Sequence, residues 1–344
     1  MTPSGTRWPR RRPARAAAAA AAVALLLSAF ILLDTPPAEN WTERVVVVAR
    51  GSHLADVVSA LRKGGVLPHP LAFRALAFLT RTDRRLQYGE YSFPTPPSAY
   101  EVWDRIHRGD AKTYKVTVPP GANLYDVAAL VAEKTLAGPE AFLSAATSPA
   151  VIERLAIPGD SVEGYLYPET YIFRKPVAPE EIVEEMVGKF REKFARELAR
   201  KAKDTELSLH EVVTIASIIE KETGVDEERP LVSAVIRRRL ALGMPLQMDP
   251  TVIYGVKRFD GTVTRKDLRT PGPYNTYLRR GLPPGPIANP GLNSLAAALE
   301  PAKTEYLYFV SRNDGSHAFS KTLPEHNRAV ERLRRALREE EEEG

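Results

Sequence analysis

The chain of 344 residues contains no cysteine, and this absence removes several kinds of chemistry at once. Without a thiol there is no disulfide framework, no thiolate metal site, no cysteine nucleophile and no lipid anchor on a cysteine. Histidine is scarce, with six residues, and none of them shows a metal-ligand spacing such as H-x-x-x-H. No glycine-rich phosphate motif occurs in the sequence either. We therefore expect neither a metal nor a cofactor.

A basic surface of the kind that binds nucleic acid is also missing. The formal net charge is +5, but residues 1–40 alone carry +3, because five arginines there outnumber two acidic residues. The rest of the chain therefore carries only +2. Nothing in it combines a basic patch with interleaved aromatic residues. We expect no nucleic-acid partner.

A long apolar segment follows the basic tail at residues 1–15. Its sequence, AAAAAAAVALLLSAFILL at 16–33, is 18 uncharged residues, which is at the short end for a membrane-spanning helix. The positive-inside rule keeps the arginines in the cytoplasm and exports the rest. We predict a single transmembrane helix over 16–34 in the cell (inner) membrane. The alternative, a cleaved signal peptide, is disfavoured because the bulky residues come last, where a small-x-small site would lie.

Two segments of the chain resemble each other, VVVARGSHLADVVSAL at 46–61 and VTVPPGANLYDVAALV at 116–131. Each predicts an alternating strand, a glycine turn and an amphipathic helix. Ser52 and Asn123 are the expected helix caps. Such β-α units resemble the LysM module, which binds the amino sugars of cell-wall glycans. We therefore assign 45–150 to a LysM-like region, with an ordinary packing repeat as the alternative.

An apolar helix is predicted between Ser208, which opens an S-x-x-E capping box, and Gly224, which is the expected left-handed C-cap. Its interior is apolar nearly all round, so we expect it to be buried. Glu220 projects from a buried face, where an ionised carboxylate is costly and a protonated one is favoured. A general acid needs that proton.

The same carboxylate has a structural interpretation, which is a buried ion pair with one of Arg237–Arg239. Glu222 is about 200° further round the helix, so we expect it to meet solvent or a partner. Three loops nearby combine tyrosines with amides and carboxylates, which suit the faces and hydroxyls of sugar rings, although core packing explains single tyrosines as well. They are SVEGYLYPETY at 161–171, LQMDPTVIYG at 246–255 and PYNTYLRRGLPPGPIANPG at 273–291.

These segments resemble the endolytic murein transglycosylases of the MltG (YceG-like) family. The matching elements are EGYLYPETY at 163–171, ASIIEKET at 216–223, LQMDPTVIYG at 246–255, YNTYLRRGLPPGPIANPG at 274–291 and YLYFVSRNDGSHAFSKTLPEHNRAV at 306–330. The resemblance implies an α+β protein with one amino-terminal membrane helix, the LysM-like region, a mixed α/β catalytic domain at 151–338 and an acidic tail at 339–344.

The resemblance also implies an activity. The family cleaves the β-1,4 bond between N-acetylmuramic acid and N-acetylglucosamine and leaves a 1,6-anhydromuramoyl end, with the C6 hydroxyl of the sugar as nucleophile. We match its catalytic residue to the first glutamate of the E-K-E segment, Glu220. Glu163 is the candidate for a second carboxylate. The other hypothetical substrate-binding residues are Tyr165, Tyr167, Gln247, Asp249, Tyr254, Tyr274 and Asn275.

Partners implied by the resemblance are peptidoglycan glycan strands, the inner membrane, penicillin-binding synthases and the elongation machinery. Cutting of nascent strands would terminate glycan elongation. Two alternatives remain open. One is a hydrolytic muramidase that uses water as nucleophile, and the other is a glycan-binding scaffold without catalysis.

Overall fold

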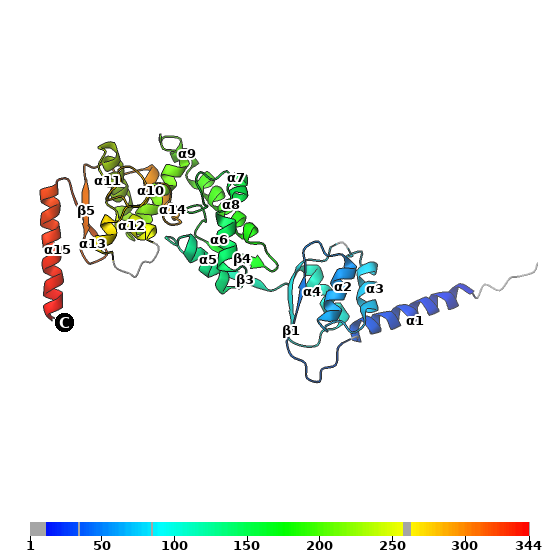
Figure 1. The fold of residues 1–344 in the computed structure, drawn as a ribbon. Helices are drawn as coiled ribbons and strands as arrows, with labels where there is room; N and C mark the ends of the chain where they lie inside the picture. Colours follow the sequence, from blue (N-terminus) through cyan, green and yellow to red (C-terminus); the bar gives the residue numbers. More distant parts are fainter. Residues whose placement is uncertain (1–11, 34, 84, 257–262, 344) are drawn as a thin grey trace, which may run out of the picture. The chain divides into compact units, whose positions relative to one another are not determined.

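The computed structural model describes residues 12–33, 35–83, 85–256 and 263–343 (Figure 1). The chain divides into two compact units. Unit 1 contains the residues up to Tyr114 together with Ile172–Val177, and unit 2 contains Lys115–Tyr171 and the residues from Ala178 onward. The division after residue 114 differs from the boundary expected at 150, because the second β-α repeat packs within unit 2.

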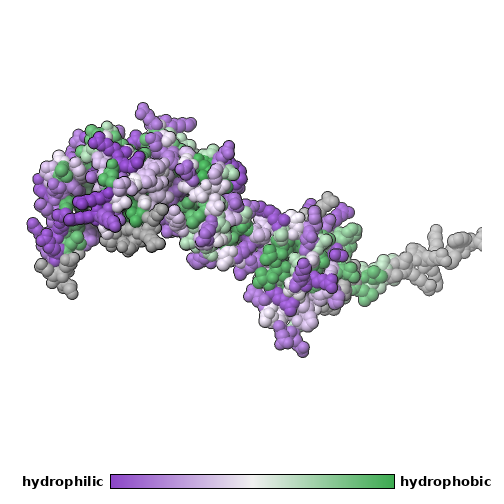
Figure 2. Space-filling model, in the orientation of Figure 1, coloured by the Kyte–Doolittle hydropathy of each residue, from purple (hydrophilic) through white to green (hydrophobic). Residues whose placement is uncertain are grey.

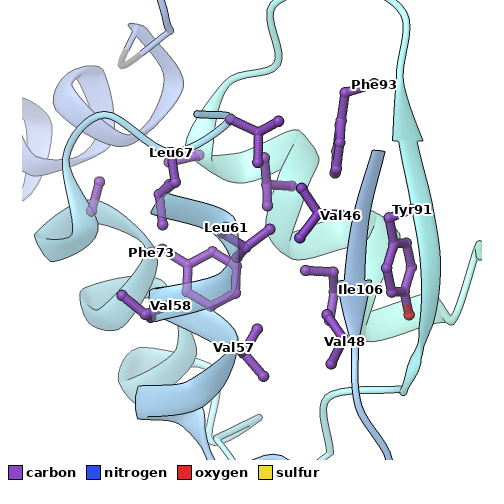
Figure 3. Close-up of a cluster of buried hydrophobic side chains, with 14 of the residues drawn as sticks. Val46, Val48, Val57, Val58, Leu61, Leu67, Phe73, Tyr91, Phe93 and Ile106 are labelled. Atoms are coloured by element: carbon purple, nitrogen blue, oxygen red, sulfur yellow. The ribbon is translucent and has the colours of Figure 1, made fainter. Parts of the chain in front are cut away.

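Unit 1 is a small α+β fold built on an antiparallel pair of strands. β1 pairs with β2 in a register that sets Arg44 opposite Phe93. Val46 and Val48 are buried while Val45 and Val47 are exposed, as the two-residue period of a strand requires. Leucine, valine and aromatic side chains from the helices complete the core (Figure 3). The elements are β1 (Arg44–Val48), α2 (Leu54–Lys63), α3 (Pro70–Leu79), β2 (Gly89–Phe93) and α4 (Ala99–Arg108).

The amino-terminal segment of unit 1 forms α1 (Arg12–Leu33), which contacts α3 and α4. Among the residues that the structure describes, no helix combines the length and hydrophobicity that crossing a membrane requires. The transmembrane helix expected at 16–34 therefore stays a prediction.

The two similar segments do form the same local structure. Gly51 and Gly121 both adopt left-handed conformations, with φ of 76° and 80°. After each glycine a helix begins, and an aspartate three residues into it accepts a hydrogen bond from the capping residue's backbone at 2.9 Å. Asn123 is the predicted cap of α5, whereas Ser52 is not a cap, because α2 begins one residue later and His53 occupies that position.

Unit 2 is mainly helical and carries short two-stranded sheets. β3 pairs with β4, and β5 pairs antiparallel with β6. α15 packs against the β5–β6 hairpin, as expected for the last helix. The paired strands β3 (Thr113–Thr117) and β4 (Thr170–Arg174) lie where the chain passes from one unit to the other. The elements within unit 2 are α5 (Leu124–Glu133), α6 (Pro139–Ala146), α7 (Pro149–Arg154), α8 (Pro179–Glu197), α9 (Ala199–Ala202), α10 (Leu209–Glu222), the 3-10 helix η1 (Asp226–Glu228), α11 (Arg229–Ala241), α12 (Asp249–Gly255), α13 (Arg265–Arg269), α14 (Leu292–Leu299), β5 (Tyr308–Ser311), β6 (His317–Ser320) and α15 (Leu323–Glu343).

The predicted apolar helix is α10, and every residue from Val212 to Ile219 is buried. It packs against α14, α11 and α12, which explains why its apolar surface runs nearly all round. Ser208 caps it through the expected capping box. The C-cap prediction is wrong. The helix ends at Thr223 in an extended conformation, with φ of −141°, and the Thr223 hydroxyl accepts a hydrogen bond from Val225 N at 3.1 Å.

Candidate active site

A cavity of about 390 Å³ lies in unit 2 at the carboxyl end of α10. Five segments distant in the sequence form its wall. α10 contributes Glu222 and α11 contributes Arg239. The segment 246–249 lies along it, followed by Tyr277 and by residues of the β5–β6 hairpin that include His317. The wall is therefore rich in polar and ionisable side chains.

Glu222 brings a carboxyl group to this cavity in an unusual state. Its Oε1 atom is buried and has no hydrogen-bond partner among the residues that the structure describes. Burial raises the pKa of Glu222 to about 8, the nearby charge of Asp249 raises it further, and Arg239 opposes both. The side chain thus holds a proton at neutral pH. Glu222 as a whole is half-buried and reaches the surface through this cavity, which agrees with the expectation that it meets solvent or a partner.

A second carboxylate in the cavity is fixed by a tyrosine. The Tyr277 hydroxyl donates a hydrogen bond to Asp249 Oδ1 at 2.6 Å. Burial first, and then the hydrogen bond to Asp249, raise the pKa of Tyr277, so the phenol stays protonated and remains a donor. Asp249 is the first residue of α12, where a negative charge suits the helix dipole.

Gln247 occupies the cavity wall in a conformation that few side chains adopt. Its φ is 52°, in the left-handed region that costs a residue with a Cβ atom free energy. The backbone is held there by neighbours. Gln247 N donates to Thr276 O at 3.1 Å, and the guanidinium of Arg239 donates to Leu246 O at 2.6 Å. The surrounding structure thus fixes Gln247 despite the strain.

His317 enters the cavity from the start of β6 and is anchored by Glu228 of η1. Its Nδ1 lies 2.7 Å from Glu228 Oε2, and its backbone N donates to Glu228 Oε1 at 2.8 Å. The Thr223 hydroxyl donates to the same carboxylate at 3.2 Å. Burial acts to raise the pKa of Glu228, but the hydrogen bonds from His317 lower it below its ordinary value. Glu228 is therefore an anion that orients the imidazole.

Glu220, the sequence-based choice for the acid, does not line this cavity. Its Oε1 lies 3.3 Å from Arg229 Nη1, and its Oε2 accepts a hydrogen bond from Gly291 N at 2.8 Å. The side chain is 8% exposed and its arginine partner 11%. Both oxygens thus face donors, as suits an ionised carboxylate. The structural alternative, a buried ion pair, is what forms, with Arg229 in place of Arg237–Arg239.

Comparison with known proteins agrees with the motifs. Residues 46–332 match the YceG-like family. The chain belongs to this family. A Bacillus subtilis (strain 168) protein named endolytic murein transglycosylase is 32% identical over 317 residues, which cover 88% of each chain. A protein of that name from Streptococcus pneumoniae (D39) is 27% identical, and the match covers 83% of this chain and 57% of the relative. A crystal structure of a yceG-like protein from Listeria monocytogenes is 32% identical, has a TM-score of 0.59 and is matched over 99% of its chain and 83% of this one.

Of the substrate-binding residues predicted in this YceG-like chain, the structure brings Gln247 and Asp249 into the cavity with Glu222. Glu163 is elsewhere and only 2% exposed. It accepts hydrogen bonds from Leu124 N at 2.9 Å and from the Tyr254 hydroxyl at 3.0 Å. Burial raises the pKa of Glu163 to about 7, and these hydrogen bonds oppose the shift. Its contacts tie α5 and α12 together, so it is not a second carboxylate of this cavity.

The remaining predicted residues make packing and turn contacts in the structure. Tyr165 is 1% exposed and packs edge-on against Phe190, with ring centroids 5.2 Å apart. Tyr254 and Tyr274 contact each other in the same way at 4.9 Å. Tyr167 is buried as well. The amide of Asn275 donates to three backbone carbonyl groups, those of residues 267, 268 and 270. None of these side chains lines the cavity of Glu222.

Three residues that sequence reasoning missed are Tyr277, Arg239 and His317. Tyr277 lies within the quoted loop 273–291, two residues after the asparagine that was chosen. Arg239 was considered only as an ion-pair partner. No local pattern distinguishes His317 from the other histidines. The apolar carboxyl end of α10 was the available signal for these residues. Because such an end must be covered, side chains from other segments were to be expected beside it.

Proposed function

We propose that this protein is a lytic transglycosylase that cleaves the glycan strands of peptidoglycan at the β-1,4 bond between N-acetylmuramic acid and N-acetylglucosamine. The observation that carries the proposal is the cavity in which the carboxyl of Glu222 lies with Gln247 and Asp249, its Oε1 atom buried and without a hydrogen-bond partner among the described residues. Membership of the YceG-like family and relatives named endolytic murein transglycosylase support the substrate.

In this proposal Glu222, rather than Glu220, is the general acid. A general acid must hold a proton near neutral pH and must reach the substrate. Glu222 meets both conditions, since its pKa is raised to about 8 and it lines a cavity. The two oxygens of Glu220 are occupied by an arginine and a backbone N–H instead. In the E-K-E segment, the first glutamate thus forms a structural ion pair, and the second, two residues later, is the proposed acid.

The reaction needs only one proton donor because the substrate supplies its own nucleophile. Glu222 protonates the glycosidic oxygen as the bond to the anomeric carbon breaks. The C6 hydroxyl of the muramoyl residue attacks the same carbon and gives its proton to a base in the cavity, which yields the 1,6-anhydro end without consuming water. Asp249, held by Tyr277, is a fixed negative charge that stabilises positive charge developing on the sugar ring.

A hydrolytic muramidase is the second candidate, because Asp249 gives the cavity a second carboxylate. Hydrolases use a second carboxylate to activate water or to attack the anomeric carbon. Two features count against it. The hydroxyl of Tyr277 occupies one oxygen of Asp249, and the named relatives are transglycosylases.

Mass spectrometry of the products separates the candidates. We expect the full-length protein to release fragments with 1,6-anhydromuramoyl ends from polymerised, uncrosslinked glycan. A muramidase would give reducing ends heavier by one water. A scaffold would bind the glycan and leave its length unchanged. Either of these two results contradicts the proposed function.

Unit 1 supports a glycan-holding function beside the catalytic one. A cavity of about 500 Å³ lies between the loop that follows β1 and the loop that precedes β2. It is lined by residues that include His53, Gln87 and Tyr88. The guanidinium of Arg50 lies over the Tyr88 ring at 4.7 Å from its centroid, which holds the ring in place. We propose that this LysM-like surface holds the amino sugars of the strand.

Attachment to the inner membrane is proposed from the amino-terminal part of unit 1. Hydrophobic surface is visible where α1 leaves the compact part of the unit (Figure 2). Val23, Leu25 and Leu26 of α1 are exposed. The neighbouring α3 exposes Leu71 and Phe78, which are seven residues apart and therefore lie on the same face of the helix. We infer that the amino-terminal apolar segment attaches the protein to the bilayer and that α3 meets its surface. This location places the enzyme beside newly made strands, with penicillin-binding synthases and elongation proteins as partners.

The membrane contact of α3 can be tested with a single label, because the chain has no cysteine. The full-length Phe78→Cys protein carries an environment-sensitive fluorophore and is reconstituted into phosphatidylglycerol-containing vesicles. We expect a blue shift and quenching by lipids that carry a nitroxide near the headgroup.

Ser59→Cys, on the exposed side of α2, is the matched control and should show neither effect. A label at 78 that remains in water, on protein that sediments with the vesicles, contradicts the contact of α3 alone. Protein that does not sediment contradicts the anchor.

A further inference from the structure

The imidazole of His317 is fixed in one tautomer with a free acceptor. Nδ1 lies 2.7 Å from Glu228 Oε2, and Glu228 is anionic, so Nδ1 carries the hydrogen of the neutral ring. Nε2 is then an acceptor. Within the part of the chain that the structure describes, Nε2 has no hydrogen-bond partner. The second hydrogen bond, from the backbone N to Oε1 at 2.8 Å, prevents the residue from swinging away.

The same carboxylate also holds the segment that carries the proposed acid. Thr223 directly follows Glu222, and its hydroxyl donates to Glu228 Oε2 at 3.2 Å. Glu228 therefore connects the end of α10 to the start of β6. His317 and Glu222 line one cavity of about 390 Å³. A proton acceptor and a proton donor thus line the same cavity.

We propose that His317 is the base of the reaction and takes the proton of the substrate's C6 hydroxyl, an inference that rests on the proposed function. The O6–H bond breaks and its proton moves to Nε2, while O6 forms a bond to the anomeric carbon. The bond from that carbon to the glycosidic oxygen breaks, and the leaving oxygen takes the proton of Glu222. Afterwards the imidazolium loses its proton and Glu222 regains one through water, which restores the resting state.

The charges around His317 favour this function. Glu228 from η1, Glu222 from α10 and Asp249 from α12 are acidic, and Arg239 from α11 is the opposing cation. The ring of Phe309 on β5 meets the imidazole edge-on, with centroids 5.5 Å apart, and excludes water from one side. An imidazolium formed during the reaction therefore gains an adjacent carboxylate. A carboxylate–histidine pair stabilises the cationic ring in this way without taking its proton.

The test compares His317→Gln with the full-length wild type in release of anhydro ends from polymerised glycan. We expect kcat to fall by about 100-fold or more, within the range for loss of a general base, with KM changed by less than about threefold. Glu228→Gln should lower kcat less, since its amide still orients the ring.

His326→Gln is the matched control, because His326 stacks on Tyr308 at 5.3 Å in the same hairpin region but does not line the cavity. It should keep kcat within about twofold, in line with a residue outside the chemistry. His317→Ala, assayed with free imidazole, covers the case in which the glutamine variant folds poorly. Recovery of kcat with imidazole supports the assignment of His317 as the base.

Two results overturn the inference. One is a His317→Gln enzyme with unchanged kcat, or with raised KM alone. The other is a His317→Ala enzyme that folds but gains no activity from imidazole. Absence of anhydro product from the wild type would instead contradict the proposed function itself.

Discussion

Replacing Glu222 by glutamine is expected to abolish glycan cleavage, whereas replacing Glu220 by glutamine should leave most of it. The new amide at position 222 fills the same space but cannot protonate the glycosidic oxygen, so we expect kcat to fall by about a thousandfold or more. Glycan binding should persist, because the cavity keeps its shape. The measurement is the rate at which anhydro ends are released, with binding of the glycan followed separately.

The Glu220→Gln variant is the matched control, since it changes the same helix by the same chemistry two residues away. It removes an ion pair with Arg229 that is only about a tenth exposed. Arg229 keeps Asp226 as a partner at 2.8 Å, so we expect a loss of about 1–3 kcal/mol in the free energy of unfolding. Activity at 25 °C should stay within about threefold of wild type. An inactive Glu220→Gln enzyme beside an active Glu222→Gln enzyme would reverse the assignment.

The sequence predicted the helix that carries both glutamates, but not which of them meets the cavity. The capping box at Ser208 and the apolar pattern are local signals, and both are confirmed. The direction of the cavity is not local, because it depends on where the segment 246–249 and the β5–β6 hairpin lie against the helix end. Because α10 is buried on every side, its apolar pattern does not indicate on which side of the helix the cavity lies. Burial and the match to the family's E-K-E segment both indicated Glu220, whose partner in the structure is Arg229.

The tyrosine-rich loops illustrate a related limit. Their composition suits sugar binding, yet it equally suits loops that must hold a fixed shape. Asn275 fastens three carbonyl groups, and Tyr165 fills the space beside Phe190. Gln247, by contrast, adopts a left-handed conformation that no composition signals. The hydrogen bonds of a side chain and the strain of its backbone distinguish residues that hold the loops from residues that line the cavity. Both properties depend on contacts between segments that are distant in the sequence.

The repeat shows what a local pattern can and cannot predict. Both copies have the expected strand, left-handed glycine and aspartate-capped helix. Beyond that the copies differ, because β1 pairs with β2 within unit 1 and β3 pairs with β4. The sequence does not encode the strand partner within the repeat itself. The second copy therefore became part of unit 2, where its helix start donates a hydrogen bond to Glu163.

Glu163 should make the stability of unit 2 fall as pH rises from about 4.5 to 7. Its pKa is 4.5 ordinarily and about 7 when buried in the folded protein. Between those values the folded state binds a proton that the unfolded state has lost, so stability decreases with increasing pH. Below 4.5 both states are protonated, and above 7 both are ionised. At 1.36 kcal/mol per pKa unit, the full change is about 3 kcal/mol.

Glu163→Gln removes this dependence, because glutamine does not ionise. Its oxygen can still accept from Leu124 N and the Tyr254 hydroxyl, although its amide hydrogens face the Asn289 amide, 3.4 Å from Glu163 Oε1. The variant should therefore be no more stable than wild type at pH 4.5, and should gain about 3 kcal/mol relative to it by pH 7.5. Glu222 is present in both proteins, so its own contribution cancels in the difference.

Urea unfolding at a series of pH values measures the difference in free energy of unfolding between the two proteins. Glu153→Gln is the control for loss of an exposed carboxylate. All three tryptophans precede residue 104, so their fluorescence follows the amino-terminal part of the chain and should not distinguish the variants. Circular dichroism reports on the helices of unit 2 and should distinguish the variants. A gap between wild type and the Glu163→Gln variant that stays constant from pH 4.5 to 7.5 would mean that Glu163 remains ionised in the folded protein. Its three hydrogen bonds would then outweigh the cost of burying the charge.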